Sequence, residues 1–114
     1  MSLHNTANIN EKSSFSNAVI NSLPSLNGLW FLKNINKLDK KFIENMDMYS
    51  YHEIIFTVIK TLNIIKLNDN DLKKIIKKAF NFPINIKKFN NICFLETFHG
   101  PTLTFKDFGA RFLA

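Results

Sequence analysis

Two long segments with apolar residues at helical spacing occupy the middle of the chain, and they restrict what it can fold into. In residues 50–65 one helix face carries Ile54, Ile55, Val58, Ile59, Leu62 and Ile65. In residues 68–80 a second face carries Leu72, Ile75, Ile76, Ala79 and Phe80. This spacing predicts amphipathic helices, whose apolar faces must be buried. We therefore expect a pair of helices that covers one core.

Local signals set the ends of these two helices. Ser50, followed by Glu53 three residues later, predicts a capping box at the start of the first helix. The second helix is predicted to begin near Asn68, with Asp69 in its first turn and lysines near its end. Acids first and bases last is the order that the helix dipole favours. Pro83 then ends the helical pattern.

Shorter elements are predicted before the helix pair. The polar residues 3–10 are expected to be extended or irregular. The serines at positions 13–14 can cap a short helix, which Pro24 ends. Residues 29–32 form a brief apolar run, which predicts either a strand or a buried loop. Residues 39–46 are interpreted as a short helix that leads into the helix pair.

The chain changes character after the second long helix. Residues 81–91 have no clear period and are interpreted as a linker. Residues 92–98 begin with a continuous apolar run, which suits a strand buried on both faces, as in a parallel sheet. Residues 105–114 place their apolar side chains on one side of a predicted helix.

The ends of these last elements lead us to expect a fragment of a longer protein. The strand at residues 92–98 has no predicted partner strand, and a lone buried strand would leave backbone groups unpaired. The final helix reaches Ala114 without a glycine cap or a polar tail.

Composition excludes several classes of protein. The chain has 114 residues, of which 46% are apolar, so it can bury a core and is not expected to be disordered. It has no apolar run of membrane-spanning length and no secretory signal, which predicts a cytoplasmic protein without a membrane partner. Cys93 is the single cysteine, so an internal disulfide and a multi-cysteine metal site are excluded. We expect Cys93 to be buried between Ile92 and Phe94.

The formal net charge of +6 leaves a small basic helical module that binds nucleic acid as an alternative. The lysines are spread along the chain, and their densest group, at residues 73–78, lies on the predicted solvent side of a helix. Arg111 is the single arginine, whereas phosphate and base recognition favour arginine. We therefore expect no nucleic-acid partner.

The segment most informative about chemistry is residues 95–109, where a predicted strand ends in a His-Gly-Pro turn. A loop rich in hydroxyl groups follows, and Lys106 opens the next helix. The amino end of a helix presents free amides and partial positive charge. We expect Lys106 to be partly desolvated between Phe105 and Phe108. Both effects favour the neutral amine, which is the nucleophile that attacks an aldehyde such as pyridoxal phosphate (PLP).

This segment resembles the PLP-attachment segment of threonine synthases, Leu-Phe-His-Gly-Pro-Thr-Leu-Ala-Phe-Lys-Asp. Residues 98–103 and 105–107 match it, while Thr104 stands where the family usually has alanine. The resemblance continues upstream, in chain order. Residues 15–19 are similar to an early Ser-Phe-x-x-Ala-Val element, residues 27–31 to a Gly-Gly-Leu-aromatic turn, and residues 79–83 to the end of the helical amino-terminal domain.

The resemblance implies a PLP-dependent lyase of threonine biosynthesis. Threonine synthases convert O-phospho-L-homoserine and water to L-threonine and phosphate. By this analogy Lys106 holds PLP as a Schiff base and moves protons at the substrate carbons. His99 and Thr102 are expected to shape the loop before the lysine, with Thr104 as a further possible contact of cofactor or substrate. Asp107 is expected to cap the helix, and no metal is implied.

The implied fold is α/β. Residues 1–83 would form a mostly helical amino-terminal domain, and residues 84–114 would begin a truncated type II PLP-enzyme fold with its first strand and its PLP-lysine helix. The groups that bind the PLP phosphate and the pyridine nitrogen would lie beyond Ala114, so we expect the isolated chain to be inactive.

Other readings of the sequence stay open. A relative of threonine dehydratases shares the Phe-Lys pair, although the His-Gly-Pro-Thr lead-in and the helical amino-terminal region favour threonine synthase. A non-catalytic remnant of such an enzyme would keep the same residues without their activity. His4 and His52 match nothing catalytic, and we expect them to be ordinary surface or half-buried residues.

Overall fold

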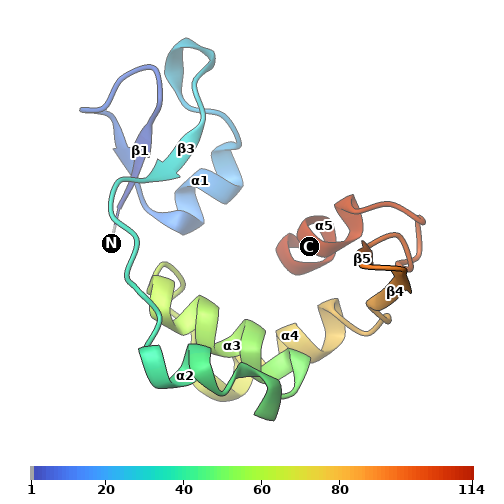
Figure 1. Ribbon diagram of the computed structural model, residues 1–114. Coiled ribbons are helices and arrows are strands. Elements are labelled where there is room, and N and C mark those ends of the chain that lie inside the picture. Colours follow the sequence, from blue (N-terminus) through green and yellow to red (C-terminus); the bar gives the residue numbers. More distant parts are fainter. Residues whose placement is uncertain (1) are drawn as a thin grey trace. The chain divides into compact units, whose positions relative to one another are not determined.

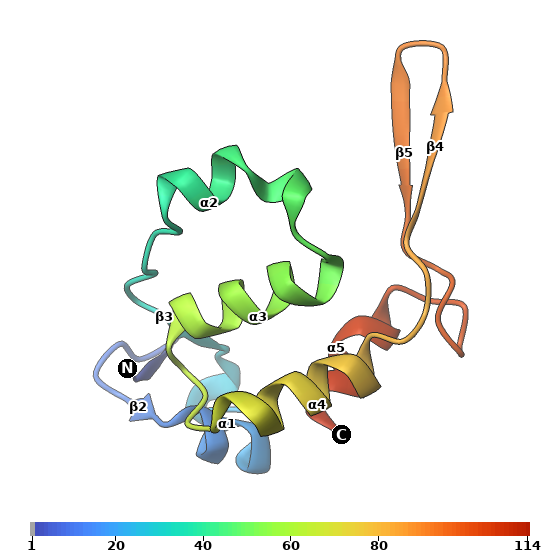
Figure 2. The same cartoon turned by 90° about the horizontal axis from the view of Figure 1, so that it is seen from below.

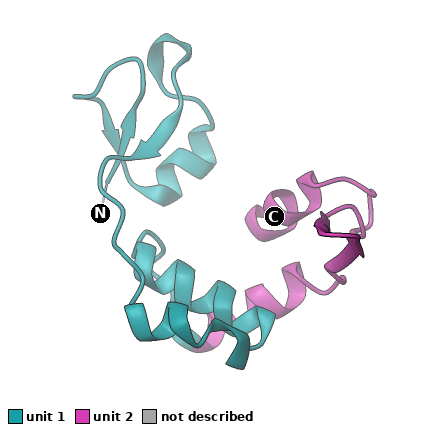
Figure 3. Cartoon of the chain, in the orientation of Figure 1, with its two compact units in different colours: residues 1–69 teal, residues 70–114 magenta. Residues whose placement is uncertain are grey.

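The computed structural model describes residues 2–114, which fall into two compact units divided between residues 69 and 70 (Figure 3). Both helices and strands are present, so the predicted α/β class is confirmed at this level (Figure 1). No helix within residues 2–114 has the length and apolarity needed to cross a membrane.

The first unit begins with a small antiparallel sheet in the strand order β2-β1-β3. Its strands are β1 (Leu3–Asn5), β2 (Lys12–Ser13) and β3 (Trp30–Leu32). Leu3 pairs with Ser13 on one side and with Leu32 on the other. The extended start of the chain is thus confirmed, and of the two alternatives for residues 29–32 the strand is right.

Asn5 is the polar centre of this sheet region, and its residue is 0% exposed. Its side-chain amide donates to the Glu11 carboxylate at 2.8 Å and to the Ser25 carbonyl at 3.0 Å. Its side-chain oxygen accepts from the Ala7 amide at 2.9 Å. A Cβ atom at Gly28 would overlap this side chain, so the Asn-Gly-Leu turn requires glycine there. The sequence analysis did not single out Asn5.

Glu11 closes the same network from its carboxylate. Both the hydroxyl and the backbone amide of Ser25 donate to it, the amide at 3.1 Å. Hydrogen bonds from the Ser25 hydroxyl, and next from Asn5, hold the pKa of the Glu11 carboxyl below its ordinary value. His4, the strand residue before Asn5, donates from its Nδ1 atom to the Ile9 carbonyl at 2.9 Å. His4 is buried, so its expected surface or half-buried position is wrong, whereas His52 is half-buried as expected.

Three α-helices complete the first unit: α1 (Phe15–Asn21), α2 (Lys40–Glu44) and α3 (Tyr51–Leu62). Two short 3-10 turns, Ser25–Asn27 and Met46–Met48, lie between them. Ser14 caps α1, and Asp39 caps α2, by accepting backbone amides. The capping box at Ser50 and Glu53 is present at the start of α3, which confirms that prediction. In place of the single helix predicted at residues 39–46, the structure has α2 followed by the 3-10 turn Met46–Met48.

The fourth helix, α4 (Asp69–Ala79), begins at the boundary and belongs almost entirely to the second unit. Leu72, Ile76 and Ala79 of its predicted apolar face are buried. The helix starts close to the predicted Asn68, whereas Ile75 of the predicted face is exposed. The prediction that α3 and α4 share one core stays a prediction.

A β-hairpin follows α4 and corrects two predictions. Residues 81–91 are not a linker, because they contain β4 (Asn85–Phe89), which pairs antiparallel with β5 (Ile92–Glu96). The strand at residues 92–96 thus has a partner within the chain, and its side chains are mostly exposed rather than buried on both faces. The turn between the strands places Asn90 at a φ of 52°, a conformation that asparagine tolerates better than most residues. Figure 2 shows the hairpin extending away from the helices of its unit.

The hairpin also corrects the expectation for the cysteine. Cys93 faces Lys88 across the hairpin and is exposed, so it is not a buried apolar residue. Its apolar neighbours Ile92 and Phe94 are likewise more than half exposed, at 57% and 52%. An apolar run in a sequence therefore did not identify a buried strand here.

Candidate functional site

The last helix, α5 (Lys106–Leu113), begins exactly where the lysine that defines the candidate site stands. The side chain of Lys106 is exposed, and no hydrogen bond or ion pair occupies its amine within residues 2–114. Phe105 beside it is 69% exposed. The expectation that aromatic neighbours desolvate Lys106 is therefore wrong for this chain, because the Phe105 ring packs on Phe108, with ring centres 5.6 Å apart, and Lys106 stays exposed.

The loop before Lys106 is held together by a carboxylate. Asp107 Oδ2 accepts from the backbone amide of Thr102 at 2.9 Å, and Asp107 Oδ1 accepts from the Thr102 hydroxyl at 2.9 Å. Thr102 in turn lies 3.0 Å from Thr104, hydroxyl oxygen to hydroxyl oxygen. The structure thus brings two of the predicted loop residues, Thr102 and Thr104, together with Asp107, which was expected to cap the helix.

Asp107 does not have the expected role of helix cap. No side chain caps the first turn of α5, and both Asp107 oxygens face the loop. Asp107 is buried, and Gly100 lies so close to it that a Cβ atom there would overlap the carboxylate. The glycine of the His-Gly-Pro turn is therefore required by the close approach of Asp107.

His99 is held by the hairpin rather than by the lysine loop. Its Nε2 atom lies 2.9 Å from a carboxylate oxygen of Glu96 and 3.2 Å from the side-chain amide of Asn85. Its ring packs on the neighbouring Phe98, with ring centres 4.7 Å apart. Because one ring nitrogen serves both contacts, it donates to Glu96 in one tautomer and accepts from Asn85 in the other. No polar contact within residues 2–114 joins His99 to Lys106.

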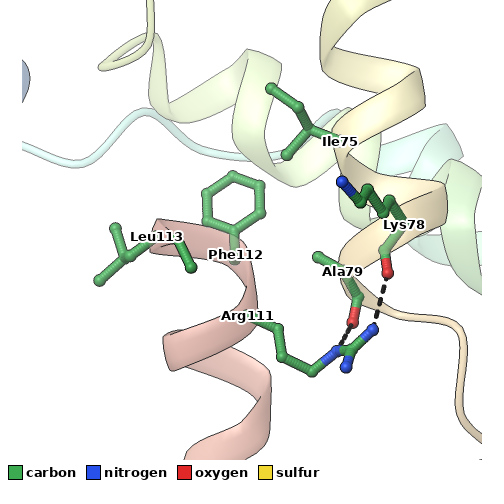
Figure 4. Close-up of a pocket in the computed structure, with 7 residues that line it drawn as sticks. Ile75, Lys78, Ala79, Arg111, Phe112 and Leu113 are labelled. Carbon is green, nitrogen blue, oxygen red and sulfur yellow. Dashed lines mark hydrogen bonds between the residues drawn. The ribbon is translucent and has the colours of Figure 1, made fainter.

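The helix that carries Lys106 is anchored at its other end by Arg111. The Arg111 guanidinium donates to the backbone carbonyls of Ala79 at 2.8 Å and Lys78 at 2.9 Å, which are carbonyls of the last turn of α4 (Figure 4). It also donates to the Asn81 side chain at 2.8 Å. Carbonyls at the end of a helix have no partner within that helix, so Arg111 satisfies two of them. The sequence analysis named Arg111 only as the single arginine of the chain and did not predict this contact.

Aromatic rings join the same two segments. Phe108 of α5 packs against Phe82 at 4.9 Å between ring centres, and Phe112 packs against Phe80 at 5.8 Å. An open cavity of about 560 Å³ lies beside these contacts, lined by Ile75, Lys78, Ala79, Arg111, Phe112, Leu113 and Ala114. Figure 4 shows that Phe112 and Leu113 line it from α5, and Ile75 from α4. The α5 residues that line the cavity come from the end of that helix, and no residue of the lysine loop is among the lining residues.

Known proteins with similar sequences and structures are threonine synthases. The family model for the threonine synthase N terminus matches residues 3–80. The threonine synthase of Buchnera aphidicola subsp. Acyrthosiphon pisum is 40% identical over 119 residues, which cover 100% of this chain and 27% of that protein. The Escherichia coli threonine synthase is 31% identical over 115 residues, again 100% of this chain and 27% of that protein.

The crystal structure of threonine synthase from Escherichia coli gives a TM-score of 0.90 at 31% identity, over 99% of this chain and 27% of that one. This similarity defines the chain as a mixed α/β protein with the architecture of part of that enzyme. The chain belongs to the threonine synthase family, as its lysine segment predicted. It spans about 27% of the length of the relatives that it matches.

Proposed function

We propose that this chain is the amino-terminal part of a threonine synthase, which converts O-phospho-L-homoserine and water to L-threonine and phosphate with PLP. The observation that carries this proposal is the extent of the similarity. The family-model match ends at residue 80, before the lysine segment. Threonine synthases align with 100% of the chain, so their alignment includes the lysine segment as well. The proposal thus rests on the helical region and the lysine segment together.

The residues of the candidate site fit a cofactor that carries an aldehyde. Lys106 has an exposed amine with no competing partner in the described chain, which is what attachment to such a group requires. When bound, PLP supplies an electron sink for charge that develops at the substrate carbons. The chain has three glycines, at three separate places, so its sequence offers no glycine-rich phosphate loop. In this proposal Lys106 is the one covalent attachment point that the chain contributes.

The proposal gives each residue of the candidate site a role. Lys106 takes up and returns protons at the substrate carbons, as a general base and acid. Thr102 and Thr104 hold the shape of the loop and present hydroxyl groups next to the lysine. His99 fixes the start of this loop to the hairpin through Glu96 and Asn85.

The finer fold assignment is part of the same proposal. Residues 1–83 would form the amino-terminal domain, and residues 84–114 would begin the catalytic domain of a type II PLP-enzyme fold. Support comes from the family-model match, which ends at residue 80, shortly before Pro83. A cytoplasmic location stays a prediction from the sequence composition.

A chimera tests the function. Residues 1–114 would replace the aligned part of the Escherichia coli threonine synthase, and the chimera would be expressed in a strain that lacks its own enzyme. We expect growth without added threonine, and phosphate release from O-phospho-L-homoserine in vitro. A chimera that folds and binds PLP without releasing phosphate would contradict the proposal.

The lysine assignment has its own variant and a matched control. Lys106→Ala is expected to lower the turnover of the chimera by several orders of magnitude, because it removes both the attachment point and the proton carrier. Lys77→Ala removes an exposed lysine of α4 and should leave turnover unchanged. Borohydride reduction followed by peptide mass spectrometry should place the pyridoxyl group on Lys106. A label on another lysine, or full activity in Lys106→Ala, would show that the assignment is wrong.

A further inference from the structure

Asp107 is a buried acid next to the exposed lysine, and this contrast needs an explanation. Asp107 is 4% exposed, although aspartate is seldom buried without partners that satisfy its charge. Its two oxygens accept from the amide and the hydroxyl of Thr102, each at 2.9 Å. Hydrogen bonds to a carboxylate are short and strong compared with those between neutral groups. The contact therefore joins the first turn of α5 firmly to the loop before it.

The contact between Asp107 and Thr102 closes a ring of residues that includes Lys106. The chain leaves Thr102, passes through Leu103, Thr104, Phe105 and Lys106, and returns to Thr102 through the Asp107 side chain. Backbone turn contacts tighten the ring, since the Asp107 amide donates to the Thr104 carbonyl at 3.3 Å. Lys106 is the last residue inside the ring, so the ring decides where its Cα atom lies.

A second, overlapping turn restrains the entry to this ring. The Leu103 amide donates to the Gly100 carbonyl at 3.0 Å, and Leu103 has a φ of 56°. A left-handed conformation is unfavourable for a leucine, and it persists only where the surrounding contacts enforce it. Gly100 contacts the Asp107 carboxylate as well, because it has no Cβ atom that would overlap it. One carboxylate thus holds both turns.

We infer that Asp107 is the positioning residue of this site, which sets the direction in which the Lys106 amine leaves the helix. Asp107 acts through Thr102 and the loop, without touching cofactor or substrate. The inference rests on the proposed function for its catalytic consequence, while the effect of Asp107 on the loop is a property of the chain itself.

The loop effect can be measured on the 114-residue chain without any cofactor. Asp107→Ala should speed amide hydrogen exchange at Thr102 and Leu103 by about tenfold or more, because their turn loses its anchor. Thr102→Val removes one of the two hydrogen bonds at an exposed residue, and it should give an intermediate increase without a change in fold. Asp47→Asn removes an exposed carboxylate elsewhere and should leave these two amides unchanged. Unchanged exchange in both loop variants would overturn the inference.

The consequence for the lysine is measured in the chimera. Asp107→Ala should lower kcat by roughly 10- to 100-fold with KM within about twofold, since misplacement of a reacting group by about 1 Å costs about that much. The fraction of pyridoxyl label found on Lys106 should fall in parallel. A rise in KM alone, or an equal loss of label and of folded protein, would mean a general structural role and would overturn the positioning role. If the unaltered chimera is inactive, the proposed function fails, and hydrogen exchange still decides whether Asp107 holds the loop.

Discussion

At the scale of single residues, Glu11 links acid stability to the amino-terminal sheet. Three donors from Asn5 and Ser25 reach its carboxylate, and they hold the pKa of this group below its ordinary value of 4.5. A group whose pKa is lowered in the folded state stabilises that state at pH values above its unfolded pKa. This stabilisation is lost as the pH falls through the lowered pKa, because the carboxylate is then protonated in both states.

Glu11→Gln should therefore lower the thermal unfolding midpoint at neutral pH and have little effect in strong acid. Circular dichroism melts of the two proteins at pH 7 and near pH 2 measure the difference at each end. Glu44→Gln is the matched control, since Glu44 makes only an exposed ion pair with Lys40 at 3.5 Å, and such pairs contribute little. A difference between wild type and Glu11→Gln that is larger in acid than at neutral pH would reverse the expected sign and refute the argument.

The candidate site shows which residues a sequence reveals and which it hides. The segment around Lys106 could be singled out from the sequence, because it resembles a specific signature, and the role of Lys106 itself stays a prediction. The contact between Asp107 and Thr102 could not be predicted, because the two residues lie five positions apart and meet only through a turn with Leu103 at positive φ. Nothing in the preferences of leucine predicts that conformation. Asn5 was hidden for a similar reason, since its partners Glu11 and Ser25 come together only in the folded sheet.

At the scale of elements, the start of α3 is specified by its own sequence. The Glu53 amide donates to the Ser50 hydroxyl at 3.4 Å, and the Ser50 amide donates to the Glu53 carboxylate at 2.8 Å. These contacts satisfy two backbone donors that the helix leaves unpaired. Ser50→Ala should therefore destabilise the chain by about 1 kcal/mol, the usual cost of losing such a cap.

Urea denaturation followed by circular dichroism measures this cost. Ser50→Thr is the matched variant, because its hydroxyl can also accept the amide and donate to the Glu53 carboxylate, as the Ser50 hydroxyl does at 2.6 Å, so it should keep most of the stability. An equal loss in Ser50→Ala and Ser50→Thr would show that the hydroxyl does not stabilise the helix as a cap.

Elements were predictable where their signals are local. The caps at Ser14 and Ser50 and the apolar face of α4 lie within a few residues of the structures they define. The hairpin was missed, because Lys87 and Lys88 interrupt the apolar pattern of β4, and its stability depends on pairing with β5. Whether a segment forms a strand depends on its cross-strand neighbours more than on its own residues, so the residue pattern of β4 alone could not predict the hairpin.

At the scale of the molecule, the segment around Phe80 belongs with the lysine helix. Phe80 and Phe82 pack on Phe112 and Phe108, and Arg111 binds the carbonyls at the end of α4. The end of the family-model match at residue 80 and the predicted boundary at Pro83 therefore fall within a packed region of the second unit. The two compact units of the chain meet earlier, between residues 69 and 70, and the domain division at residue 83 stays a prediction.

The exposed hairpin has a consequence for the behaviour of the isolated chain. Cross-strand pairing puts Ile86 and Leu95 on one face and Phe94 on the other, and these side chains are 69%, 64% and 52% exposed. A two-stranded hairpin is barely stable alone, and exposed apolar strands tend to associate with other copies. The net charge of +6 opposes association only weakly at high salt, where repulsion is screened.

Phe94→Lys should therefore reduce self-association of the 114-residue chain, measured by sedimentation velocity at several protein concentrations and at high salt. The lysine removes an aromatic surface from the hairpin and adds a charge that a second hairpin would have to bury. Met48→Lys is the matched control, because it adds the same charge at an apolar residue that is 79% exposed and lies outside the hairpin. If association falls equally in both variants, net charge governs it and the hairpin does not. If only Phe94→Lys reduces it, the hairpin is the surface through which the chains associate.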